Sequence, residues 1–191
     1  MNVFISGGCK NGKSMYAQKL AKETALREGK KLYYVATMRA RDMEDENRIK
    51  RHREERKGWG FRTIEQSCRI TSLLSKANVD PTGVFLIDSV TALLENEIFD
   101  EEFNFDEYAH KRVTEDLINF ALSTGNVIFV SDYIYGDGIF YGEVTEKYRQ
   151  SLAYVDRALA KFCESVKEAV AGRIIDYKQV ENNRCKMINC L

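Results

Sequence analysis

Short apolar segments alternate with longer amphipathic segments along most of the chain. Four segments rich in β-branched and aromatic residues are expected to form strands, the last two buried on both faces: residues 2–6, 31–37, 84–90 and 126–132. The segment 13–28 carries apolar side chains at helical spacing and precedes Gly29, a residue suited to the left-handed turn that ends a helix.

The remaining segments complete an alternating pattern. Further helices are expected over residues 42–56, 69–77, 91–99, 106–123 and 143–169. Extended segments are expected over 61–66 and 173–178, followed by a loose tail over 179–191. Strands that alternate with helices favour an α/β fold with a mostly parallel central sheet flanked by helices. The length of 191 residues fits one domain, 1–191.

The charge of the chain is balanced, with 29 Lys and Arg residues against 29 Asp and Glu residues. General binders of nucleic acids or membrane surfaces usually carry a basic excess, so we expect neither partner. No apolar run reaches the ~20 residues of a membrane span. A strand is expected to begin almost at Met1, so we expect no targeting signal. Five scattered cysteines without a CxxC pair indicate a reduced protein, and we expect a cytoplasmic location.

A glycine-rich loop follows the first predicted strand. The segment Gly7–Ser14 reads GGCKNGKS, which has the G-x4-G-K-S spacing of a phosphate-binding loop. In that motif, backbone N–H groups and a helix N-terminus surround phosphate oxygens. Lys13 would reach the β- and γ-phosphates of a nucleotide, and the Ser14 hydroxyl would bind Mg²⁺. A glycine turn without a ligand is the alternative, which the strand–loop–helix context disfavours.

Two further strands end in a carboxylate. Asp88 closes the run VFLID, and we expect its strand to lie beside the first one, where Asp88 would hold Mg²⁺ together with Ser14. Alternatively, Asp88 caps the following helix. Asp132 closes VIFVSD. A carboxylate at this position is explained equally well by a role in binding substrate and by the start of a turn. The loop after it carries Tyr133, Tyr135 and Tyr141, which would form either a mobile lid or ordinary loop packing.

The most charged helix places a histidine between two arginines. Arg48, His52 and Arg56 are spaced four residues apart and therefore share one helical face. Like charges disfavour a protonated imidazole, so His52 would stay neutral and nucleophilic while the arginines hold a polyphosphate. The spacing alone favours the simpler alternative of a solvated helix that is laced by salt bridges.

The combination of GGCKNGKS, YVAT (34–37), RIKRHREER (48–56), Trp59 and LIDSVTALLENEIF (86–99) resembles one family. It is the bifunctional adenosylcobinamide kinase / adenosylcobinamide-phosphate guanylyltransferase family of cobalamin biosynthesis. The resemblance covers about the first hundred residues well and implies a phosphate-loop, RecA-like nucleoside triphosphate hydrolase fold, usually in a homotrimer. In the second half, SDYIYGDG (131–138) stands where the family usually carries an Asn-Glu-Val-Gly segment.

The resemblance also implies roles for individual residues. His52 would be the nucleophile that carries GMP covalently, with Lys13 as the second catalytic residue and Ser14 and Asp88 on the metal. The implied nucleotide site comprises Gly7, Gly8, Cys9, Lys10, Asn11, Gly12, Lys13, Ser14, Ala36, Thr37, Met38, Arg53, Arg56, Glu65 and Asp88.

The expected function is therefore a two-step transferase that uses GTP or ATP, Mg²⁺ and a corrinoid. One step phosphorylates adenosylcobinamide, and the other passes GMP from GTP through His52 to the phosphorylated corrinoid. Two alternatives stay open: a phosphate-loop kinase or NTPase of another small molecule without the histidine relay, and a nucleotide-binding regulatory protein with little turnover. The intact Lys13, Ser14 and Asp88 disfavour the second alternative.

Overall fold

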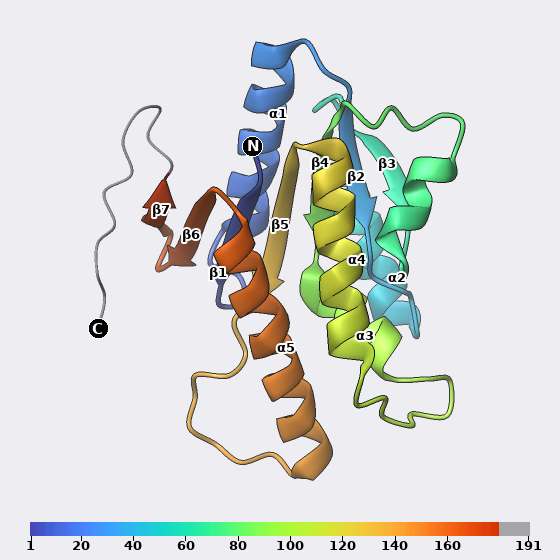
Figure 1. Ribbon diagram of the computed structural model, residues 1–191, viewed down its shortest axis with the longest axis vertical. Coiled ribbons are helices and arrows are strands. Elements are labelled where there is room, and N and C mark those ends of the chain that lie inside the picture. The colour runs from blue at the N-terminus through green and yellow to red at the C-terminus, as the bar shows by residue number, and fades with distance from the viewer. Residues whose placement is uncertain (180–191) are drawn as a thin grey trace.

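The computed structural model describes residues 1–179, apart from the side chains of Arg48, His52, Glu55 and Gln179. A seven-stranded sheet forms its centre, in the order β3-β2-β4-β5-β1-β6-β7 (Figure 1). The strands are β1 (Val3–Gly7), β2 (Leu32–Ala36), β3 (Arg62–Glu65), β4 (Val84–Asp88), β5 (Val127–Asp132), β6 (Ser165–Val170) and β7 (Arg173–Gln179). All paired neighbours run parallel except β6 and β7, which form an antiparallel hairpin at one edge.

Helices cover both faces of the sheet. The helices are α1 (Lys13–Glu28), α2 (Met43–Glu55), α3 (Val90–Ile98), α4 (Ala109–Thr124) and α5 (Glu143–Phe162), with a short 3₁₀ helix η1 (Ile70–Ser75). Because successive side chains of a strand point to opposite faces, the residues of β1 divide between two cores. Phe4 packs with α3, α4 and α5, whereas Val3 and Ile5 pack with α1. The expected α/β fold with a mostly parallel sheet is confirmed.

Aromatic residues fill the larger of the two cores. Phe85 of β4 stacks on Tyr33 of β2 with ring centroids 4.8 Å apart, and it meets the edge of Phe120 from α4 at 5.0 Å. All three rings are almost completely buried. These contacts hold α4 against the middle of the sheet, and α4 in turn packs against α5.

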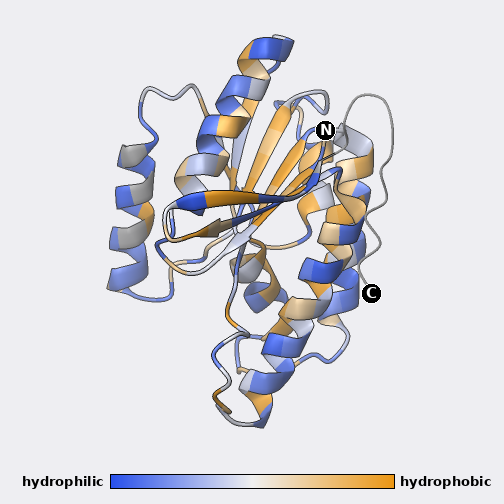
Figure 2. Cartoon of the chain, turned by 90° about the vertical axis from the view of Figure 1, so that its left-hand side faces the viewer, coloured by the Kyte–Doolittle hydropathy of each residue, from blue (hydrophilic) through white to orange (hydrophobic). Residues whose placement is uncertain are grey.

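Helix α2 differs from the other helices because it lacks an apolar face. Its first turn is acidic, with the Asp42 side chain accepting a hydrogen bond from the Asp45 backbone N–H at 2.8 Å. The described side chains of α2 are exposed apart from Asp45 and Ile49, which are half-buried. Figure 2 shows a short hydrophilic helix of this kind standing apart from the sheet on the side of α1. The expected strongly charged helix is therefore confirmed.

The expected boundaries differ from the structure mainly near the C-terminus. The helix expected over 143–169 is wrong beyond Phe162, because residues 165–170 form β6 between β1 and β7. In β6 the burial alternates, with Ser165, Lys167 and Ala169 buried and the residues between them more exposed, which is the period of a strand. The helix expected over 69–77 is only the six-residue η1. The tail expected after residue 179 lies outside the described residues.

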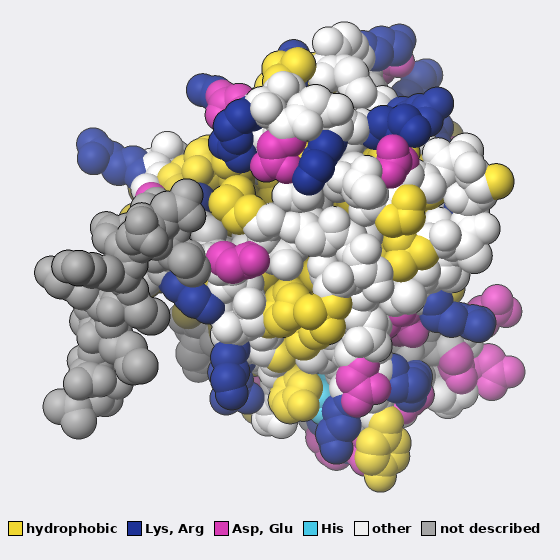
Figure 3. Space-filling view, turned by 45° about the horizontal axis from the view of Figure 1, so that its top comes forward, with side chains coloured by type: hydrophobic (Ala, Val, Ile, Leu, Met, Phe, Trp, Pro, Cys, Tyr) yellow, Lys and Arg dark blue, Asp and Glu magenta, His cyan; other side chains and the backbone are white. Residues whose placement is uncertain are grey.

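The described surface agrees with the balanced charge. Figure 3, which brings the top of Figure 1 forward, shows positive and negative side chains interspersed on that face, without a continuous stripe of one sign. Among residues 1–179, no helix combines the length and the apolar character that crossing a bilayer would require.

Burial on α4 gives a direct test of the packing. Leu117 is completely buried, whereas Leu122 on the same helix is 68% exposed. Replacement of Leu117 by Ala should lower the free energy of unfolding by about 2–5 kcal/mol, because it leaves a cavity in the core. The matched replacement Leu122→Ala should change it by less than about 0.5 kcal/mol. Urea unfolding of the two variants measures both values, and equal losses would contradict the packing described.

Candidate nucleotide site

The glycine-rich loop lies at the edge of the sheet where the parallel strands end. It connects β1 to α1, and at two of its positions the backbone requires a glycine. A Cβ atom on Gly7 would lie 2.5 Å from the backbone oxygen of Ala169 in β6, so no larger residue fits between the strands. Gly12 has a φ angle of 85°, a conformation that glycine adopts without strain. The strand–loop–helix context that the motif requires is therefore present.

The N-terminus of α1 is open towards an anion. Its N-cap is Gly12, no described side chain caps the first backbone N–H groups, and no acidic residue lies in the first turn. Unpaired N–H groups and the positive end of the helix dipole attract phosphate oxygens. Ser14 lies half-buried in this first turn, and Cys9 is exposed in the loop.

Lys13 is the best-defined charged residue of the site. It is only 6% exposed, and its Nζ donates a hydrogen bond to the backbone oxygen of Gly8 at 3.1 Å. The same ammonium group forms an ion pair with Asp132 at the end of β5. Asp132 lies in register with Gly7, because β5 is the direct neighbour of β1. A buried ammonium requires such a partner, because an unpaired buried charge is strongly unfavourable.

Asp88 lies further from the loop than the sequence suggested. The expectation that its strand lies beside β1 is wrong, because β5 lies between β4 and β1. The Tyr34 hydroxyl donates a hydrogen bond to Asp88 at 2.8 Å. The alternative that Asp88 caps the next helix is also wrong, because the Ser89 side chain accepts the capping hydrogen bond from the Ala92 backbone N–H at 3.1 Å.

Residues 36–38 follow β2 at the same edge. Thr37 is fully buried, and its hydroxyl exchanges hydrogen bonds with the backbone of Ser89, donating to the oxygen at 2.7 Å and accepting from the N–H at 2.8 Å. Asn96 of α3 donates to the Thr37 backbone oxygen at 2.8 Å. These contacts join the end of β2 to the end of β4. The register places Ala36 between Asp88 on β4 and Glu65 on β3, so the predicted nucleotide residues follow one edge of the sheet.

The end of α2 is fastened to this edge by arginines. Arg56 is 6% exposed, and its guanidinium lies 3.6 Å from the centre of the Tyr34 ring. Arg53 forms an ion pair with Glu65, and both side chains are exposed. The backbone of His52 lies in the same last turns of α2 as Arg53. The side chains of His52 and Arg48 lie outside the described residues, so their predicted roles stay predictions.

The sequence analysis did not predict which residue pairs with Lys13. In the structure that residue is Asp132. It could have been predicted, because a buried lysine needs a carboxylate nearby and Asp132 ends a predicted strand. The Asp132 backbone N–H donates to the Thr91 hydroxyl of α3 at 2.8 Å. Asp132 is therefore fixed by α3 as well as by its strand.

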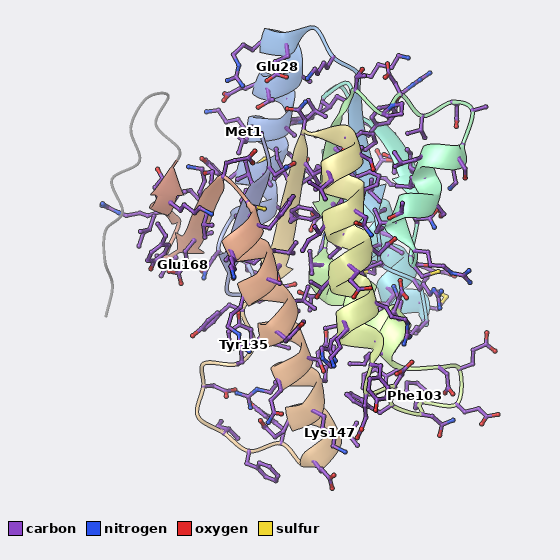
Figure 4. All side chains as sticks on the ribbon, viewed as in Figure 1. Met1, Glu28, Phe103, Tyr135, Lys147 and Glu168 are labelled. Carbon is purple, nitrogen blue, oxygen red and sulfur yellow. The ribbon has the colours of Figure 1, made fainter. Side chains whose placement is uncertain are left out.

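The loop after Asp132 shows the contacts of ordinary packing. The Tyr135 hydroxyl donates to Asp156 of α5 at 2.9 Å, and Figure 4 shows Tyr135 beside that helix. Arg149, 7% exposed, donates to the Ile139 backbone oxygen at 2.7 Å and to Asp137 at 3.0 Å. These bonds fasten the loop to α5.

Asp156 is a buried carboxyl group directly behind this edge. It is 3% exposed, and burial raises its pKa from 3.8 to about 7, against the opposing effect of hydrogen bonds from Ser131 and Tyr135. Between about pH 4 and pH 7 the folded protein keeps a proton that the unfolded chain has lost. This group alone therefore makes the protein less stable as the pH rises through that window.

Substitution of Asp156 by Asn tests this assignment. The amide keeps the shape and can still accept the Tyr135 hydrogen bond, but it does not titrate. The stability of Asp156→Asn relative to the unsubstituted protein should rise by roughly 1–3 kcal/mol between pH 5 and pH 8. Urea unfolding of both proteins across this range measures the difference, and parallel stability curves would contradict it.

Similarity to solved structures supports the fold. A KaiC-like protein from Pyrococcus horikoshii aligns with a TM-score of 0.50 and 14% identity, over 97% of this chain and 82% of that one. The chain thus has the phosphate-loop, RecA-like fold expected from its sequence.

Similarity in sequence points to one group of enzymes. The bifunctional adenosylcobalamin biosynthesis protein CobP of Pseudomonas aeruginosa is 28% identical over 90% of this chain and 94% of its own length. The bifunctional adenosylcobalamin biosynthesis protein CobU of Salmonella typhimurium is 24% identical over 90% of this chain and 97% of its own length. The family described as cobinamide kinase / cobinamide phosphate guanyltransferase matches residues 3–177. The chain therefore belongs to the cobinamide kinase / cobinamide phosphate guanyltransferase family and is a transferase.

Proposed function

We propose that the protein phosphorylates adenosylcobinamide and then transfers GMP from GTP to the product, giving adenosyl-GDP-cobinamide. The observation that carries the proposal is the combination of family membership with a phosphate loop whose lysine is buried at an open helix N-terminus. Both reactions act on a nucleoside triphosphate, so one cationic cradle serves both steps.

In the kinase step, the loop from Gly7 to Ser14 holds the triphosphate. Lys13 and the N–H groups at the start of α1 neutralise charge on the phosphates as it redistributes during transfer. The donors present suit Mg²⁺, which prefers oxygen ligands and usually keeps several waters beside one or two carboxylates. Ser14 and Asp88 would hold the ion, which when bound would supply positive charge that polarises the phosphates.

In the guanylyl step, His52 attacks the α-phosphorus of GTP. A P–N bond forms as the bond to the bridging oxygen breaks, and pyrophosphate leaves with the electron pair. The phosphate of the corrinoid then displaces the imidazole and takes the GMP. Arg53 and Arg56 lie close to His52 in the chain and meet the sheet at Glu65 and Tyr34, which supports a polyphosphate at this end of α2.

One observation favours a second candidate, a small-molecule kinase or NTPase without the histidine relay. Most described side chains of α2 are exposed, and the body of the helix stands apart from the sheet, as expected for a solvated helix. Steady triphosphate turnover that leaves the protein unlabelled and does not depend on His52 would favour this candidate. The homotrimer and the cytoplasmic location implied above stay predictions, as does the single domain over 1–191.

Loss of the Lys13 ammonium tests the kinase step. Incubation with adenosylcobinamide, Mg²⁺ and ATP or GTP should yield the phosphorylated corrinoid, detected by mass. Substitution of Lys13 by Ala should reduce its rate of formation by about 10²–10³, the usual effect of losing one preorganised charge-stabilising group. Comparison of the two nucleotides in the same assay identifies the donor. Undiminished product with Lys13→Ala would refute the assignment.

A covalent label tests the guanylyl step. Incubation with GTP carrying ³²P at the α-phosphate should label the protein in an acid-labile, base-stable bond, as expected for a phosphorus–nitrogen linkage. The label should disappear in His52→Ala and persist in His110→Ala, which removes the other histidine of the chain. His110 serves as the control because it packs against Tyr154 on α5, at a ring distance of 4.8 Å. Equal labelling of both variants would rule the relay out.

A further inference from the structure

Asp132 combines contact with the phosphate-binding lysine and access from solvent. Its side chain is 29% exposed, whereas that of its partner Lys13 is 8% exposed. Its strand β5 lies between β1, which leads into the phosphate loop, and β4, which ends at Asp88. The Asp132 carboxylate therefore lies at the end of the strand that separates the phosphate-loop strand from the strand of Asp88, the proposed metal residue.

The contact with Lys13 locates Asp132 relative to a bound nucleotide. A lysine at this position of a phosphate loop reaches the β- and γ-phosphates. A group that touches its ammonium in the free protein must therefore lie close to the γ-phosphate in the complex. When phosphate oxygens take over Lys13, the carboxylate loses that ion pair and is available to accept a hydrogen bond from an acceptor hydroxyl.

We propose that Asp132 is the general base of the kinase step, accepting the proton of the acceptor hydroxyl. This inference rests on the proposed function, because the acceptor is the hydroxyl that the kinase step phosphorylates. The hydroxyl loses its proton to the Asp132 carboxylate as its oxygen bonds to the γ-phosphorus. The bond from that phosphorus to the β,γ-bridging oxygen breaks, and the nucleoside diphosphate leaves with the electron pair. The proton passes from Asp132 to water afterwards.

The surroundings hold Asp132 in a fixed position for this role. Its backbone N–H is bound by the Thr91 hydroxyl, and the Thr91 backbone oxygen accepts a hydrogen bond from the Tyr148 hydroxyl of α5 at 3.1 Å. The next N–H along the chain, that of Tyr133, donates to the Gly7 backbone oxygen at 2.9 Å. Contacts with α3, α5 and the phosphate loop thus fix the end of β5. The carboxylate itself contacts Lys13, which a bound nucleotide would engage.

The neighbouring carboxyl groups are less suited to the task. Asp88 accepts a hydrogen bond from Tyr34 and lies one strand further from the loop. Asp137 is bound by both Arg149 and Tyr141. Asp156 is almost completely buried behind the edge of the sheet.

Replacement of Asp132 by Asn tests the proposal, because the amide keeps the shape but cannot accept the proton. With adenosylcobinamide and the nucleotide that serves as donor, kcat should fall by at least about 100-fold, the usual contribution of a general base. The KM for the nucleotide should be unchanged or lower, since Lys13 no longer leaves an ion pair on binding.

The control is Asp80→Asn. Asp80 likewise pairs with a lysine, Lys31, at 3.2 Å, but it lies in the turn before β4, at the opposite edge of the sheet. This variant should keep the kcat and the nucleotide KM of the unsubstituted protein. Should Asp132→Asn fail to fold, Asp132→Ser removes the base equally and allows the same measurements.

The outcomes separate this inference from the proposed function. An unsubstituted protein that forms no phosphorylated corrinoid refutes both. If the unsubstituted protein is active and the Asp132 variants keep its kcat, the assignment of the base alone is refuted. A raised nucleotide KM with unchanged kcat also refutes it, because Asp132 would then only tether Lys13.

Discussion

The ion pair between Lys13 and Asp132 is the interaction on which the arrangement of the site depends. An ammonium group that is almost out of reach of water must have a negative partner close by, because an uncompensated buried charge costs several kcal/mol. In the free protein that partner comes from the neighbouring strand, and in a nucleotide complex it would be phosphate. The loop, the start of α1 and the end of β5 therefore form one electrostatic unit. The other predicted nucleotide residues extend from this unit along the edge of the sheet.

Much of the fold followed from local patterns in the sequence. The helix over 13–28 has an unambiguous beginning in the glycine loop and an end at Gly29, and its bounds agree with the structure. The strands ending at Asp88 and Asp132 were recognisable because strands buried on both faces are continuously apolar. The residues after Phe162 were misjudged, because SVKEAV is short and its apolar positions fit a helix as well as a strand. Pairing with β1 decides its structure, and that contact is not encoded locally.

The site was predictable in the same measure. Sequence motifs predicted the loop and Asp88 as site residues, and the resemblance predicted roles for residues of α2, which stay predictions. The order of the strands was not recoverable from local sequence, so Asp88 was expected next to β1 when β5 in fact lies between them. The same strand order gives Asp132 its contact with Lys13. The residue spacing predicted that Arg56 shares a face of α2 with His52. It could not predict the contact between Arg56 and the Tyr34 ring, which anchors the end of the helix.

The close approach of Gly7 to Ala169 joins two strands that lie far apart in the sequence. The phosphate loop ends at Ser14. Its strand β1 pairs with β5 on one side, but pairing on the other side requires β6, residues 165–170. Until then β1 is an edge strand with unpaired backbone groups, a state prone to association with other chains. During synthesis, the support of the phosphate loop is therefore complete only after residues 165–170 have been made. Nucleotide can stabilise the nascent chain fully only from that moment, although the loop motif is translated long before the strand that supports it.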